Sequence, residues 1–171
     1  MSASSFDHDD ADDATLLEAQ CLFHLGHAEE VRSQHEQAKH YYVIALQRFQ
    51  AEGKQKVAKL PHGDDDGSES VYVEGKLLVE LEAINLWTAR ILRHMARIHK
   101  GMGSVENAVS CYEESLRIRS QCKTVKKKNV NSAVIKHELG ICLYGAQKYD
   151  SSLEYLAQCV LPYVTRYGKN S

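Results

Sequence analysis

The sequence of 171 residues predicts an all-α chain in which antiparallel helix hairpins stack into a solenoid. No segment alternates apolar and polar residues as a half-buried strand does, and the chain has only two prolines. Small residues recur in pairs twelve positions apart, at 26 and 38, 96 and 108, and 140 and 152. A bulky residue follows each pair four positions later, as expected where two helices approach closely through small side chains.

The first hairpin follows an acidic segment, residues 1–13, which has little to bury and is expected to be disordered. Its first helix is expected over about residues 13–32. The apolar residues spaced near the helical period predict its buried stripe: Leu16, Leu17, Cys21, Leu25 and Ala28. Its second helix is expected over about 34–59 and is stopped by the turn at Pro61.

A long third helix is expected over residues 70–100, with near-heptad spacing of its apolar residues. Its first half and the tail of the second helix form an insertion, about 54–88, which is predicted to pack as a hairpin extension. The remaining helices are expected at about 105–122, 131–144 and 149–160. Pro162 is expected to bend or end the last of them.

Composition and charge argue against several classes of protein. The net charge of −2 gives no general reason to expect nucleic acid or an anionic membrane as partner. The N-terminus has no basic or apolar signal segment, and no run of residues is long and apolar enough for a membrane span. A cytoplasmic location is therefore expected.

The sequence contains no catalytic motif, nucleotide-binding loop or paired metal-binding cysteines. His24 and His27 are half a metal site at best, so no metal and no cofactor are expected. Cys21, Cys142 and Cys159 lie in apolar helical stretches and are predicted to be buried core residues. The chain is therefore not expected to be an enzyme.

The repeated pattern resembles the tetratricopeptide repeat family. The resemblance covers three copies, at about residues 19–52, 89–122 and 133–165, within a single domain over 14–168. The segment around Tyr112 is also weakly similar to the longer repeats of kinesin light chains. In the third copy, Lys136 and Ser152 replace apolar or smaller residues, which predicts a terminal repeat that faces water.

The resemblance implies a non-catalytic scaffold or adaptor whose first helices line a concave groove that holds a peptide. By their offsets from the small residues, the predicted groove positions are Phe23 and His27 in the first copy, Arg90, Arg93, Arg97 and Lys100 in the second, and His137, Ile141 and Tyr144 in the third. Family members that bind chaperone carboxylates carry a lysine and an asparagine at the offsets of Phe23 and His27. A chaperone clamp is therefore not expected.

The four cations of the second copy lie on one stripe of the third helix, because they are spaced by three, four and three residues. A basic stripe at the family's groove positions predicts an acidic or phosphorylated peptide segment of a protein partner. Two alternatives stay open: a solvated helix face without a ligand, and pairing with the chain's own aspartate-rich segments.

A second basic region, residues 117–128, supports the alternative of an RNA-associated helical-repeat protein. It contains Arg117, Arg119, Lys123 and three consecutive lysines, but no aromatic residue on which bases could stack. Protein partners are therefore favoured over nucleic acid. The sequence leaves self-association open.

Overall fold

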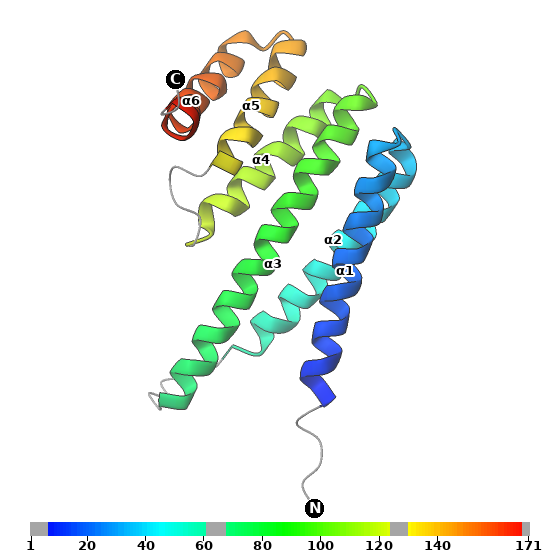
Figure 1. Cartoon of the computed structure of the whole chain (residues 1–171), viewed down its shortest axis with the longest axis vertical. Helices are drawn as coiled ribbons and strands as arrows, with labels where there is room; N and C mark the ends of the chain where they lie inside the picture. Colours follow the sequence, from blue (N-terminus) through cyan, green and yellow to red (C-terminus); the bar gives the residue numbers. More distant parts are fainter. Residues whose placement is uncertain (1–6, 61–67, 124–129, 169–171) are drawn as a thin grey trace, which may run out of the picture. The chain divides into compact units, whose positions relative to one another are not determined.

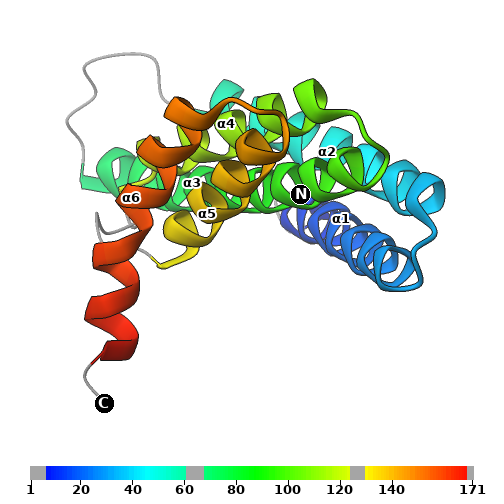
Figure 2. The ribbon, with the colours of Figure 1, turned by 90° about the horizontal axis from the view of Figure 1, so that it is seen from above.

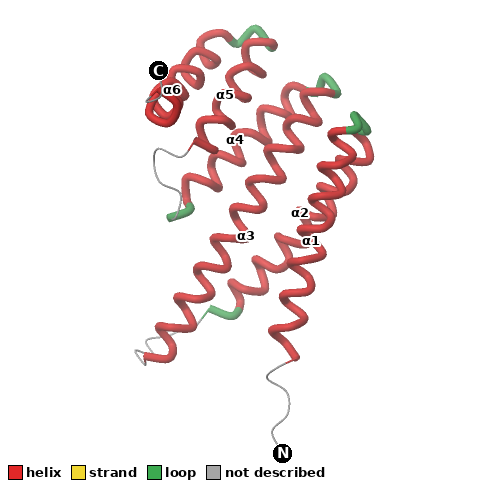
Figure 3. Tube along the Cα trace, in the orientation of Figure 1, coloured by secondary structure: helices red, strands yellow, loops and turns green. Residues whose placement is uncertain are grey.

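The computed structural model describes residues 7–60, 68–123 and 130–168, and within these ranges it contains helices and no strand. The helices are α1 (Asp7–Val31), α2 (His35–Ala58), α3 (Ser68–Gly101), α4 (Val105–Gln121), α5 (Val130–Gly145) and α6 (Tyr149–Tyr167), as Figures 1 and 3 show. The all-α class predicted from the sequence is confirmed. The acidic residues before Asp7, the loop at 61–67 and the lysines at 126–128 lie outside the described residues.

The chain divides into two compact units, residues 1–91 and 92–171, with the boundary inside α3. Unit 1 contains α1, α2 and most of α3. Unit 2 contains the last turns of α3 and the helices α4, α5 and α6. Each unit is described by itself below, and the single domain expected over 14–168 stays a prediction.

Three helix pairs are joined by turns of the same backbone conformation. Ser33, Gly103 and Gln147, each seven residues after a small residue of the repeated pattern, have φ values of 60°, 76° and 62°. In each turn the following residue donates its N–H to the carbonyl five positions earlier, at 2.8–3.0 Å. The regular spacing in the sequence thus corresponds to a repeated turn geometry.

The small residues lie at close helix crossings, as predicted. A Cβ atom on Gly26 would lie 2.8 Å from the ring of Tyr42 on α2, and one on Gly140 would lie 2.7 Å from Leu156 on α6. The Ser152 hydroxyl donates a hydrogen bond to the Gly140 carbonyl at 2.8 Å, so the serine of the third copy is buried and satisfied at its crossing. Figure 2 shows α5 and α6 joined as one such hairpin.

Unit 1 buries a different face of α1 from the predicted one. Ala19, Phe23 and Gly26 are buried, whereas Cys21 and Leu25 of the predicted stripe are exposed. Both sets of residues have helical spacing, and close approach to Tyr42 requires the face that carries Gly26. The prediction of a buried Cys21 was therefore wrong, while the predictions for Cys142 and Cys159 are confirmed.

The insertion packs as predicted, with the tail of α2 against the first half of α3. The rings of Phe49 and Trp87 stack with centroids 5.7 Å apart. Further along, the buried Lys56 ammonium lies 2.9 Å from Glu80 on α3 and 3.5 Å from Glu52 on its own helix. Apolar stacking and ion pairs therefore hold the two helices together.

Unit 2 is built around a core to which three helices contribute. The buried side chains of this cluster are Ala96 from α3, Ala108 and Tyr112 from α4, and Ile135, Leu139, Cys142 and Leu143 from α5. Helix α6 packs on the other side of α5 through Ser152 and Cys159. The core thus positions the last turns of α3 next to α4 and α5.

Two helix ends differ from the sequence-based expectations. Helix α1 begins at Asp7, six residues before the expected start, so the predicted acidic lead overlaps its first turns. Helix α6 continues through Pro162 to Tyr167, so the proline does not end the helix. Figures 1 and 2 show the last turns of α6 running in a different direction from its first turns, which agrees with the expected bend.

Candidate functional site

In unit 1, the aromatic side chain predicted to line the groove belongs to the core. Phe23 is only 1% exposed and its ring centroid lies 5.7 Å from that of Tyr42 and 5.4 Å from that of Trp87. The assignment of Phe23 to the ligand-contacting surface was therefore wrong. His27 is exposed on the same helix, with its ring stacked on Phe23 at 6.4 Å.

Arg90 lies over this aromatic cluster. Its guanidinium carbon is 4.8 Å from the centroid of the Phe23 ring and 5.0 Å from that of Trp87. A cation over aromatic faces is attracted by the ring quadrupoles. The first residue of the predicted basic stripe thus packs on aromatic rings of its own unit while its side chain remains exposed.

In unit 2, Arg93 is held by an acidic residue that the sequence analysis did not identify. Its Nε and Nη2 atoms donate to the two carboxylate oxygens of Glu138 on α5, at 2.7 and 2.6 Å. Both side chains are partly buried. A bidentate pair of this kind is among the stronger charge-assisted hydrogen bonds in proteins, so Glu138 neutralises part of the basic stripe.

The next two cations of the stripe, Arg97 and Lys100, border a cavity of about 340 Å³. Gly101, Tyr112 and Glu138 complete its lining, and both cations are exposed. The cavity therefore contains two positive side chains, one carboxylate already engaged by Arg93, and a phenol.

The phenol of Tyr112 is electrostatically coupled to these charges. Burial raises the pKa of Tyr112 well above its ordinary value, and the negative charge of Glu138 raises it further. Arg97 and Arg93 act in the opposite direction, by a smaller amount. The phenol therefore ionises less readily than that of an exposed tyrosine.

The predicted groove residues of the third copy lie on α5, close in sequence to Glu138. Ile141 and Tyr144 are exposed, and the Tyr144 ring meets that of Tyr149 edge-on at 5.6 Å. His137 is also exposed, with its ring edge-on to Tyr163 at 6.2 Å. Glu138 and Ile141 are three residues apart on one helix, so an apolar surface adjoins the acidic side of the cavity.

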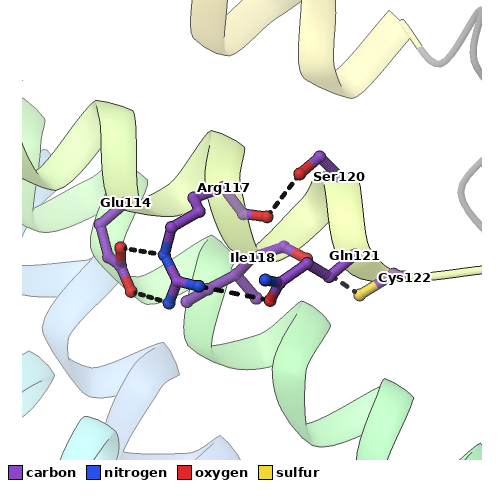
Figure 4. A network of polar contacts seen from close by, with 6 residues as sticks. All are labelled: Glu114, Arg117, Ile118, Ser120, Gln121 and Cys122. Carbon is purple, nitrogen blue, oxygen red and sulfur yellow. Dashed lines mark hydrogen bonds and ion pairs between the residues drawn. The ribbon is translucent and has the colours of Figure 1, made fainter.

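Where the structure describes the second basic region, one of its three cations is paired with a carboxylate. Arg117 makes two hydrogen bonds of 2.6 Å to the carboxylate of Glu114 and a longer one to Gln121, as Figure 4 shows. Arg119 is buried, with its Nε 3.5 Å from the Ser132 hydroxyl, and burial lowers its pKa. Lys123 is exposed. The two arginines that the RNA alternative would use therefore each contact a residue within the chain.

The turns, helix crossings and cavity of unit 2 lie in a segment with a known family pattern. Residues 87–160 match the sequence model of the tetratricopeptide repeat. This segment belongs to the tetratricopeptide repeat family. Tetratricopeptide repeats mediate protein–protein interactions and scaffolding, and they are typically non-catalytic.

Comparisons with curated proteins and with solved structures gave the following results. No curated protein matches the sequence. Among solved structures, the crystal structure of MamA protein aligns with a TM-score of 0.37 and 14% sequence identity, covering 88% of this chain and 95% of that chain. Within the described residues, no helix has both the length and the apolar character needed to cross a bilayer.

Proposed function

We propose that this chain is a non-catalytic interaction module that binds an acidic segment of a partner protein at the cavity of unit 2. The observation that supports this most directly is the pair of exposed cations, Arg97 and Lys100, at the border of that cavity. Arginine can bind a carboxylate or phosphate through two parallel hydrogen bonds, and lysine adds a mobile point charge.

The surrounding residues define what such a segment would contain. Ile141 and Tyr144 offer exposed apolar surface for the ligand's uncharged side chains. Exposed ion pairs contribute only about 0.2–1 kcal/mol each, so the apolar contacts must supply much of the affinity. An acidic or phosphorylated segment with interspersed apolar residues fits this requirement best, and a modest affinity is expected.

The experiment uses a fluorescent octaglutamate peptide as probe and measures its anisotropy as the protein is added. The double substitution Arg97→Glu/Lys100→Glu should abolish binding and leave the melting temperature nearly unchanged. The matched control is Lys54→Glu/Lys123→Glu, which changes the net charge equally at two exposed lysines elsewhere. The control should retain most of the affinity.

Ionic strength provides a second readout, because the Debye length falls to about 3 Å at 1 M salt and screens exposed charges. Binding should therefore weaken strongly in high salt. If both double variants lose binding equally, the attraction depends on total charge and the cavity is not the site. A single-stranded RNA probe that binds more tightly than octaglutamate would favour the RNA alternative instead.

A further inference from the structure

The first and last helices of the chain each expose an apolar face. On α6, Tyr149, Leu153 and Val160 are 54–66% exposed. On α1, Cys21 and Leu25 are exposed, together with Ala28 one turn later. The polar outer face expected for a terminal repeat is therefore not present on α6, although solenoids usually need one where no neighbour covers the end.

The repeat spacing identifies the counterparts of the α6 face. The small residues Ala96 and Gly140 are 44 positions apart, and the same shift relates α4 to α6. This shift of 44 positions pairs each exposed α6 residue with one α4 residue: Tyr149 with Val105, Leu153 with Val109, and Val160 with Leu116. All three α4 residues pack against the core cluster that joins α4 to α5.

The α1 face has buried counterparts as well. Gly26 and Gly140 are 114 positions apart, which matches Cys21, Leu25 and Ala28 with Ile135, Leu139 and Cys142 of α5. These three residues are buried in the same core cluster. Leu143 is the one α5 residue of the cluster whose counterpart in the described residues is polar. This counterpart is Glu29, which forms an ion pair with Arg32 near the end of α1.

The exposed faces of α6 and α1 thus correspond to the two sides of an interface that the chain already forms between α4 and α5. We infer that α6 of one molecule packs against α1 of a second copy of this chain, in the manner of α4 against α5. One molecule carries both sides of this contact, so the same interface covers both exposed faces. Such a contact joins different surfaces of the two copies, and it therefore extends into a row or closes into a ring.

Analytical ultracentrifugation of the full chain tests this inference independently of peptide binding. The average molecular mass of the parent should rise as the protein concentration is increased to about 1 mM. Leu153→Glu on α6 and Leu25→Glu on α1 should each raise the dissociation constant on the order of 100-fold, because an unpaired carboxylate would enter an apolar contact. Val79→Glu, at an exposed apolar residue of α3, is the matched control and should behave as the parent does.

An equimolar mixture of the two interface variants gives the decisive measurement. The intact α6 of the Leu25→Glu variant can still pair with the intact α1 of the Leu153→Glu variant, so the mixture should form dimers and nothing larger. Far-UV circular dichroism should show unchanged helicity in both variants. A parent that stays monomeric at every concentration would overturn the inference and leave these faces to a different partner. Dissociation by Leu153→Glu alone would overturn it in favour of a symmetric contact between two α6 helices.

Discussion

Replacing Gly26 by alanine tests the close crossing of α1 and α2. The new Cβ atom would lie 2.8 Å from two carbons of the Tyr42 ring and 3.2 Å from the Ala38 carbonyl oxygen. Carbon atoms pack best at about 3.5–4.0 Å, so either the ring or the helix must move. The ring is fully buried, and its hydroxyl donates a 2.7 Å hydrogen bond to Glu30, which restricts its movement.

Two opposing effects determine how much Gly26→Ala changes the free energy of unfolding. Alanine is favoured over glycine inside a helix by about 0.5–1 kcal/mol. Overpacking a well-filled core costs about 1–3 kcal/mol. Substitution of Gly75 in α3 measures the favourable effect alone. A Cβ at this position would meet no atom within 4 Å, so Gly75→Ala gains helix propensity without overpacking.

Urea denaturation followed by far-UV circular dichroism gives the free energy of unfolding of each variant. Gly75→Ala should be more stable than the parent, and Gly26→Ala should be less stable than Gly75→Ala by about 1–3 kcal/mol. Adding Tyr42→Leu to Gly26→Ala should make the glycine substitution less costly, since the ring is removed. If Gly26→Ala were as stable as Gly75→Ala, the small residues would not mark close helix crossings.

Three further predictions use the same denaturation and binding measurements. Ser33→Gly and Gln147→Gly should each stabilise the chain by about 0.5–1 kcal/mol, and Gly103→Ala should destabilise it, because all three positions have positive φ. Glu138→Gln should strengthen octaglutamate binding by about 0.2–1 kcal/mol, since an arginine now occupied by Glu138 becomes available to the ligand; equal affinity in parent and variant would contradict this. The raised pKa of Tyr112 means that the unfolded phenol ionises first, so the free energy of unfolding should fall as pH rises above about 10, and Tyr112→Phe should show a weaker fall.

The sequence predicted the local features of the fold well, because they depend on short spacings. The twelve-residue interval between small residues located the crossings of Gly26 with Tyr42 and of Gly140 with Leu156. The choice of buried face on α1 could not be made in the same way. Two apolar faces share the helical period, and the one carrying Phe23 is selected by aromatic partners as distant in sequence as Trp87.

The candidate site likewise has one feature that follows from local spacing and one that depends on residues distant in sequence. The alignment of Arg93, Arg97 and Lys100 on one face of α3 follows from helical geometry alone. The pairing of Arg93 with Glu138 joins residues 45 positions apart, and no local pattern signals it. Sequence reasoning therefore located the basic surface but overestimated its free charge, because it could not identify the internal counter-ion.

The ion pairs of Lys56 constrain how the insertion can assemble. The Lys56 side chain is about 10% exposed, and its ammonium lies 3.5 Å from the Glu52 carboxylate and 2.9 Å from that of Glu80. Burying charges contributes little net stability, but removing one partner from such a group is costly. If α2 slid along α3 by one turn, the ammonium would lose Glu80 and remain buried with one carboxylate. The three charged residues therefore favour one register of α2 against α3. Apolar contacts between two long helices are less specific, so they would allow several registers.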